Sequence, residues 1–293
     1  MLGPLSFVAS VAFALGSAEV TLGPPREVEF PFEDDLRLLP GESNAGKLWR
    51  SHGLHDDGSA VPLVVFVHGI IFDGQRHHWL TVDPAGPWDA RPFMDALVDD
   101  GALPPLVVAV PSQTRDATDP SKLFVGIDFD AFVNAVDTAL APHQRVDRSR
   151  IVVLGHSGSA CDPDSGAFAA LHAKTFTPRA FIAVDGCLAA SGARLLATTT
   201  GARDVIVAYQ QQIWSERPFF EFKSAFERSL EQTWPHGLRI LDHNELASEN
   251  AHLALVEVTA RRWLPVVLPP DRLAWTAYMT GELPSLPVLS SLL

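Results

Sequence analysis

The segment of residues 151–159 constrains the fold of this chain more than any other stretch. It reads Ile-Val-Val-Leu-Gly-His-Ser-Gly-Ser. The four leading apolar residues predict a β-strand buried on both faces of a sheet, and the two glycines predict a tight turn around Ser157. In a strand-to-helix turn of this kind the central side chain stands at the carboxyl edge of the sheet, and the residues two positions before and after it must be small. Gly155 and Ser159 meet that requirement, although the usual pattern has glycine at both positions.

The rest of the chain alternates between short apolar segments and segments with helical periodicity. The apolar segments, which are rich in β-branched residues and predict strands, are 62–71, 106–110, 151–154, 181–185, 205–208 and 238–241. The helical segments between them are 92–99, 129–140, 167–173, 219–234 and 253–264. This alternation predicts an α/β fold with a doubly wound, mostly parallel sheet of about eight strands and helices on both faces.

The amino-terminal part has a different character. Segments 26–32, 36–39 and 47–51 predict short strands separated by proline, glycine and acidic turns, as expected of an antiparallel edge to the sheet. The sequence contains no internal repeat and no linker long enough to separate two domains. We therefore expect residues 19–293 to form one domain.

Residues 1–18 have the features of a cleavable export signal. They carry no charged side chain, and their apolar stretch, 5–15, is followed by the small residues Gly16, Ser17 and Ala18. A signal peptide usually begins with a basic residue, which is missing here, and a buried amino-terminal strand or helix is the alternative. The apolar stretch is too short to span a membrane. We expect a secreted or periplasmic protein.

The charge of the chain argues against a polyanionic partner. The formal net charge is −13 at pH 7, and no basic cluster occurs in the sequence. Proteins that bind nucleic acid need a cationic surface to displace counterions. His77 and His78, with Asp73 before them, do not form a recognised set of metal ligands. We expect a small-molecule partner and no nucleic acid, metal or organic cofactor.

The strand predicted at 62–71 contains Val67-His68-Gly69 and leads into Ile70. If Ser157 is a nucleophile, the oxygen of the attacked carbonyl becomes negative and needs two backbone N–H donors. In hydrolases with such a turn, one donor follows the third strand and the other directly follows the nucleophile. Ile70 and Gly158 occupy these positions. A strand end with a buried histidine is the alternative interpretation.

A serine hydroxyl is a weak nucleophile until a base takes its proton, and the base needs an acid to orient it. The histidines that follow the turn are His172, His236, His243 and His252. His172 falls within a predicted helix and His236 precedes the last strand, so neither is expected at the edge that carries the turn. We favour His252 as the base because it directly precedes the helix predicted at 253–264. His243, just after the last strand, is the alternative.

The acid is predicted from the strand ends. Asp185 ends the strand 181–185 and precedes Gly186, so its carboxylate is expected at the same edge as Ser157. Glu216, after the next strand, is the main alternative, and Asp204 and Asp242 are further ones. Aspartate followed by glycine is also common turn chemistry.

These residues resemble the α/β-hydrolase superfamily, in particular its microbial esterase-like serine hydrolases. The resemblance spans residues 27–268 and is carried by Val67-His68-Gly69, Gly155-His156-Ser157-Gly158-Ser159, Val184-Asp185-Gly186-Cys187-Leu188 and His252 ahead of Trp263-Leu264-Pro265. It implies a Ser157–His252–Asp185 triad that hydrolyses an acyl bond without a cofactor. It favours Asp185 over Glu216, because a similar subgroup ends the strand after the nucleophile with an Asp-x-Cys segment.

Carboxylic esters are the expected substrates of such a triad. A peptidase or amidase would use the same three residues. A non-catalytic protein of the same fold that binds a ligand is a third hypothesis.

The two cysteines lie at the carboxyl ends of strands that are expected to be neighbours. Cys161 follows Ser157 by four residues, and Cys187 follows Asp185 by two. A Cys161–Cys187 disulfide would join the nucleophile turn to the acid loop, and export would allow it to form. Two separate buried thiols are the alternative. The separation of the two Cα atoms, which the sequence does not give, decides between them.

Overall fold

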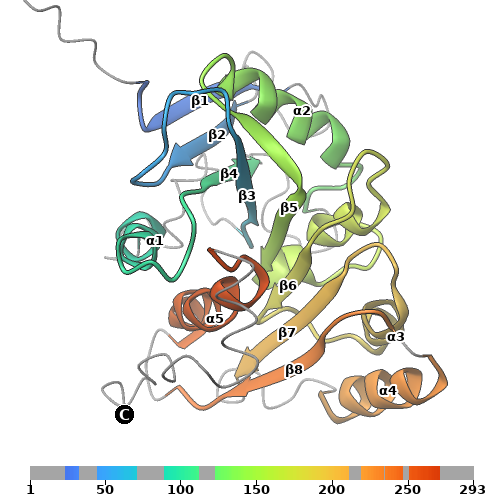
Figure 1. Ribbon diagram of the computed structural model, residues 1–293. Coiled ribbons are helices and arrows are strands. Elements are labelled where there is room, and N and C mark those ends of the chain that lie inside the picture. The colour runs from blue at the N-terminus through green and yellow to red at the C-terminus, as the bar shows by residue number, and fades with distance from the viewer. Residues whose placement is uncertain are drawn as a thin grey trace, which may run out of the picture.

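The computed structural model describes residues 24–32, 45–70, 89–111, 123–210, 219–233, 235–246 and 251–270. Within these ranges eight strands form one sheet in the order β1-β2-β4-β3-β5-β6-β7-β8 (Figure 1). They are β1 (Glu27–Pro31), β2 (Ala45–Arg50), β3 (Ala60–Val67), β4 (Val107–Pro111), β5 (Arg145–His156), β6 (Ala180–Val184), β7 (Asp204–Gln210) and β8 (Arg239–Asn244). β2 is antiparallel to both β1 and β4, and all other pairs are parallel. The predicted fold class is confirmed.

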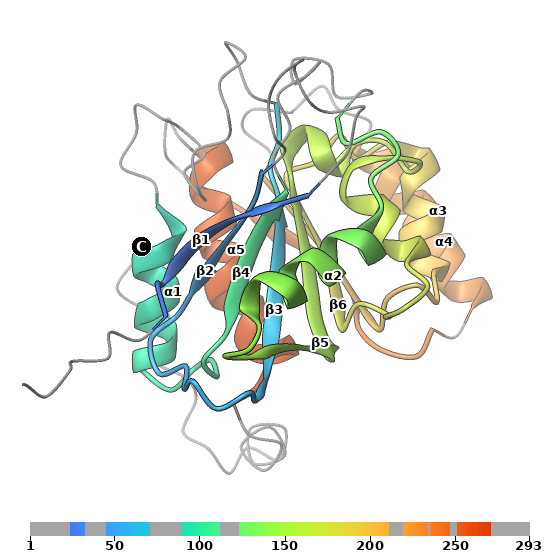
Figure 2. The ribbon, with the colours of Figure 1, turned by 90° about the horizontal axis from the view of Figure 1, so that it is seen from above.

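Helices cover both faces of the sheet. They are α1 (Ala90–Asp99), α2 (Phe129–Leu140), α3 (Ala190–Thr198), α4 (Phe219–Gln232) and α5 (Ala251–Val267), with the 3-10 helices η2 (Ser157–Ala160) and η3 (Gly166–His172). α1 and α5 pack on one face, and α2, α3 and α4 pack on the other (Figure 2). None of these described helices is long and apolar enough to cross a membrane. The predicted export segment, 1–18, and the predicted strand 36–39 lie outside the described residues.

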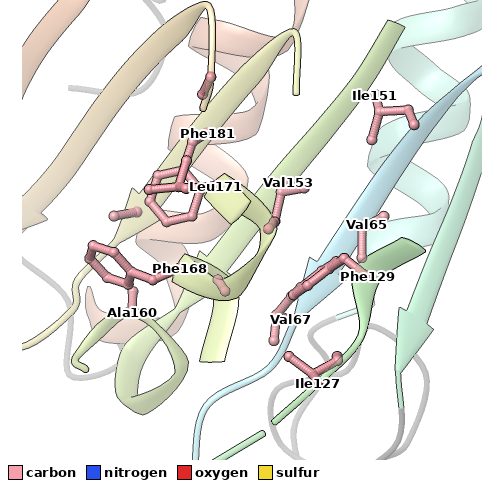
Figure 3. Packing of buried hydrophobic residues seen from close by; sticks show 14 of the residues in the cluster. Val65, Val67, Ile127, Phe129, Ile151, Val153, Ala160, Phe168, Leu171 and Phe181 are labelled. Atoms are coloured by element: carbon pink, nitrogen blue, oxygen red, sulfur yellow. The ribbon is translucent and has the colours of Figure 1, made fainter. Parts of the chain in front are cut away.

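The central strands are buried on both faces because successive side chains enter two different cores. In β3, Val65 and Val67 face the core under α2, whereas Val64 and Phe66 face the core under α1 and α5. Figure 3 shows the first of these cores, with Phe129 of α2 beside the side chains of β3. The uninterrupted apolar runs of the sequence follow from this double burial.

The register of the parallel strands brings their carboxyl ends to one edge of the sheet. Gly155 of β5 lies opposite Val67 of β3 and Ala183 of β6. Val184, the last residue of β6, lies opposite Ala208 of β7. The segments that leave β3, β5 and β6 therefore start close together, and they contain the predicted site residues Ile70, Ser157, Gly158 and Asp185.

Candidate active site

The predicted turn after β5 is present, with β5 ending at His156 and η2 beginning at Ser157. Ser157 has a φ of 56°, which lies in the left-handed region that residues other than glycine rarely adopt. Backbone strain of this kind is typical of functional turns. Ser157 is partly exposed, whereas Gly158 and Ser159 are buried. The turn therefore presents one accessible side chain, that of Ser157.

The small residues on both sides of Ser157 have separate structural reasons. A Cβ atom added at Gly155 would lie 2.4 Å from the Cβ of Ala167 in η3, so no side chain fits there. The hydroxyl of Ser159 donates to the carbonyl of Val67 at 2.7 Å and accepts from the N–H of His156 at 3.1 Å. The serine that replaces the usual glycine thus ties the turn to the end of β3.

The two predicted oxyanion donors lie next to each other beside Ser157. A Cβ atom added at Gly69 would lie 2.6 Å from the Cβ of Ser157, so the loop after β3 packs directly on the turn. A Cβ atom added at Gly158 would lie 3.6 Å from the main-chain nitrogen of Ile70. The main-chain nitrogen of Ile70 therefore lies close to Gly158, the residue that directly follows Ser157.

Asp185 and His252 form a direct hydrogen bond. Nδ1 of His252 lies 2.5 Å from Oδ2 of Asp185, whose side chain is fully buried, whereas 22% of the His252 side chain is exposed. Asp185 directly follows β6, and its N–H donates to the carbonyl of Ala208 at 2.8 Å. Because the carboxylate accepts from Nδ1–H, Nε2 of His252 is left as the nitrogen that can take a proton.

His156 connects this pair to the nucleophile turn. Its ring centroid lies 4.5 Å from that of His252, and it directly precedes Ser157 in the chain. His252 is the second residue of α5, which begins at Ala251. His252 therefore lies within the first turn of the helix, whereas the sequence predicted that it precedes the helix.

Two histidines beside the turn are buried. Burial lowers the pKa of His68 to about 4, although the Gly69 carbonyl, which accepts from Nδ1 at 2.8 Å, opposes this shift. Burial, with the nearby His252 as the next cause, lowers the pKa of His156 to about 3. Both imidazoles are therefore neutral at neutral pH.

The alternative base, His243, lies elsewhere. Its ring stacks on Tyr209 with centroids 5.2 Å apart, and it lines a surface pocket together with Phe219 and Lys223 of α4. Its neighbour in β8, Asp242, contacts α5. Because successive residues of a strand face opposite sides of a sheet, His243 points toward α4 and away from the α5 face.

The alternative acids have other partners or are not described. Asp242 accepts from Nη1 of Arg262 and Nε1 of Trp263, both at 2.6 Å, and so anchors α5. Asp204 begins β7, at the opposite end of the strand from the site, and pairs with Arg179. Glu216 lies outside the described residues, as do His77, His78 and Asp73. Within the described ranges no group of three or more His, Cys, Asp or Glu side chains is arranged to hold a metal ion.

A disulfide joins Cys161 and Cys187, whose Cα atoms lie 4.6 Å apart. Of the two alternatives left by the sequence, the disulfide is confirmed. It links the end of η2 to the loop that begins with Asp185. The segments that carry the candidate nucleophile and the candidate acid are therefore covalently connected.

Two site residues were missed by the sequence analysis. Gln210 donates from Nε2 to Oδ2 of Asp185 at 3.2 Å, and Nε2 of His156 lies 3.1 Å from the carbonyl oxygen of His252. The sequence offered one signal for them, their position. Each is a polar residue that follows an apolar run and ends its strand.

The sequence matches no protein-family model, and no curated protein is similar to it in sequence. Solved structures are similar in fold. A ferulic acid esterase is 13% identical, with a TM-score of 0.53 over 84% of this chain and 98% of that chain. An enterobactin esterase from Shigella flexneri is 16% identical, with a TM-score of 0.52 over 85% of this chain and 60% of that chain. An uncharacterised protein from Capnocytophaga ochracea is 10% identical, with a TM-score of 0.52 over 86% of this chain and 68% of that chain. The strand order and these neighbours show that the chain has the α/β-hydrolase fold.

Proposed function

We propose that the protein is a serine hydrolase that cleaves carboxylic esters, with Ser157 as nucleophile, His252 as base and Asp185 as the acid that orients it. The observation that carries the proposal is the bond between His252 and the buried carboxylate of Asp185. This bond lies at the sheet edge where the Ser157 turn stands, and no other described carboxylate among the candidates has a histidine partner there.

The proposed reaction has two steps. Ser157 Oγ attacks the ester carbonyl while Nε2 of His252 takes the hydroxyl proton, and Asp185 holds Nδ1–H and stabilises the imidazolium. The N–H groups of Ile70 and Gly158 stabilise the oxyanion, and loss of one such donor costs roughly 3 kcal/mol in other hydrolases. His252 then protonates the leaving alcohol and activates a water molecule that hydrolyses the acyl-enzyme.

Esters are favoured over amides by the structural neighbours, two of which are named as esterases. A peptidase or amidase would need the same three residues, so the leaving group has to be tested directly. Matched p-nitrophenyl esters and p-nitroanilides of the same acyl group separate the two activities. We expect turnover of the esters and slow or no turnover of the anilides.

A fluorophosphonate probe tests the nucleophile. We expect the purified protein to be labelled and Ser157→Ala not to be labelled. Ser224→Ala is the matched control, because Ser224 lies in α4, where its hydroxyl accepts from Arg228 at 2.8 Å, away from the site. Labelling that persists in Ser157→Ala would remove Ser157 from the reaction, and a wild-type protein that is neither labelled nor active would favour the ligand-binding hypothesis.

Export is part of the proposal. The disulfide is typical of proteins from oxidising compartments, and the first 18 residues have the pattern of a signal peptide. Amino-terminal sequencing of the protein secreted by an expression host tests this, and a mature chain that begins near Glu19 is the expected result.

A further inference from the structure

His156 is a titratable side chain that the proposed reaction does not use. It is the last residue of β5, directly before Ser157, and it is only 1% exposed. Removing a polar imidazole from water costs free energy unless its polar atoms find partners. The partner that the structure gives its Nε2 atom is the main chain of His252.

Two contacts join His156 to His252. Nε2 of His156 lies 3.1 Å from the carbonyl oxygen of His252. The two rings lie 4.5 Å apart between centroids, with an interplanar angle of 38°. Because a carbonyl oxygen only accepts hydrogen bonds, Nε2 of His156 carries the proton and donates it. One side chain therefore contacts both the main chain and the ring of the proposed base.

His156 is itself fixed to the nucleophile turn. Its N–H donates to the hydroxyl of Ser159 at 3.1 Å, and that hydroxyl donates to the carbonyl of Val67 in β3 at 2.7 Å. The main chain on both sides of His156 thus belongs to the sheet and the turn. Its side chain is the link from this rigid part to the first turn of α5, which carries His252.

We propose that His156 is a positioning residue, which places the His252 imidazole relative to Ser157 through its Nε2–H donor. This proposal rests on the triad proposed above. A displacement of about 1 Å in a catalytic group can cost a factor of about 100 in rate, so a residue that fixes this distance affects turnover without touching the substrate. The low pKa of His156, about 3, keeps its imidazole neutral at neutral pH.

The variants His156→Gln and His156→Leu test the role of the donor. The glutamine amide nitrogen can reach the place of Nε2 and donate to the same carbonyl, whereas leucine fills the space without a donor. The measurements are kcat and KM for p-nitrophenyl acetate, the rate of fluorophosphonate labelling and the Tm. We expect His156→Gln to keep kcat within about threefold, and His156→Leu to lower kcat and the labelling rate by roughly 30-fold with KM unchanged.

Each other outcome overturns the proposal. Equal kcat in both variants and the wild type means that the contact does not place His252, and a folded but inactive His156→Gln means that a donor to the His252 carbonyl is not what His156 supplies. If His156→Leu does not fold, His156→Phe, which keeps a ring, takes its place. If neither apolar variant folds while His156→Gln does, the donor serves folding and the proposal is wrong. An active Ser157→Ala would instead refute the proposed function, whatever the His156 variants do.

Discussion

Asp185 is a carboxylate without exposed surface, and two of its polar contacts come from different elements. Nδ1 of His252, from α5, lies 2.5 Å from its Oδ2, and Nε2 of Gln210, from the end of β7, lies 3.2 Å from the same atom. A buried charge is tolerated when donors satisfy it. Gln210 supplies a donor that cannot titrate, so it can orient the carboxylate without adding a second charge.

The first prediction concerns Gln210. We expect Gln210→Leu to lower kcat about tenfold, because Oδ2 of Asp185 loses a donor that holds it toward Nδ1 of His252. In the Asp185→Ala background the same change should have little further effect, since the acceptor of the Gln210 hydrogen bond is absent. A double-mutant cycle on kcat measures this coupling. Additive effects would show that Gln210 does not act through Asp185.

The second prediction separates the two candidate bases. His252→Ala should lower kcat by about 10⁴-fold or more, because members of a triad act as a unit. His243→Ala is the matched control and should retain kcat, since its ring stacks on Tyr209 on the α4 side of the sheet. Kinetics with p-nitrophenyl acetate provide the measurement, and the reverse ranking would assign the base to His243.

At the scale of the elements, prediction from the sequence succeeded for strands that are buried on both faces of the sheet. β3, β4 and β6 are apolar throughout, and β7 is apolar between Asp204 and Gln210, because both faces are covered. α2 was predicted at its observed bounds, since its apolar residues repeat with helical spacing and Asp128 caps it by accepting from Ala131 N–H at 3.0 Å. Strong periodicity and a polar cap fixed this helix locally.

Elements with weak local signals were missed. The first half of β5 is rich in charged residues, and only Val146 among Arg145–Arg150 is buried, so it resembled a loop. α3 has no side-chain cap at Ala189 and contains Gly192, so neither a start signal nor high helix propensity marked it. The segment predicted as a helix at 167–173 is the 3-10 helix η3, which begins at Gly166. Gly166 has a φ of 59°, and a Cβ atom added there would lie 2.2 Å from the carbonyl oxygen of Ser159.

The residues of the candidate site also differ in how strongly the local sequence marks them. Ser157 and Asp185 were predicted because each follows an apolar strand and precedes glycine. The contacts of Gln210 and His156 depend on strand register and on how α5 packs. The local sequence around these two residues determines neither the register nor the packing. Sequence reasoning therefore named the candidate residues Ser157, His252 and Asp185, and it missed the contacts that Gln210 and His156 make with Asp185 and His252.

The disulfide yields the third prediction, at the scale of the turn and the acid loop. Cys161 and Cys187 are separated by 26 residues in sequence, and a disulfide that closes a loop of that size stabilises the folded protein by about 3.5 kcal/mol. We expect the double variant Cys161→Ala/Cys187→Ala to lose about this much free energy of unfolding in urea. Wild-type protein measured with a reducing agent is the control and should match the variant. An unchanged unfolding midpoint would contradict the prediction.

For the molecule as a whole, the buried histidines link stability to pH. The pKa values of His68 and His156 are lowered to about 4 and about 3, below the value of about 6.5 expected in the unfolded chain. Between these values the unfolded state binds more protons than the folded state, so stability decreases as the pH falls below about 6.5. Each histidine contributes a slope of at most about 1.4 kcal/mol per pH unit.

The fourth prediction follows from this linkage. Urea unfolding of the wild type should give a smaller free energy at pH 4.5 than at pH 7, and in His156→Gln this decrease should be smaller by about 2–3 kcal/mol. His243→Ala, which removes an exposed imidazole, should follow the wild type. Parallel curves for the wild type and His156→Gln would contradict the prediction.

The left-handed backbone of Ser157 implies a trade-off between durability and chemistry. In an ordinary strand or helix, glycine is less stable than alanine by about 0.5–1 kcal/mol. At a φ of 56° the order should invert. We expect Ser157→Gly to have a free energy of unfolding in urea about 1 kcal/mol larger than that of Ser157→Ala, and we expect neither variant to turn over an ester. Selection for stability alone would therefore favour glycine at residue 157, and the serine makes the folded protein less stable than glycine would.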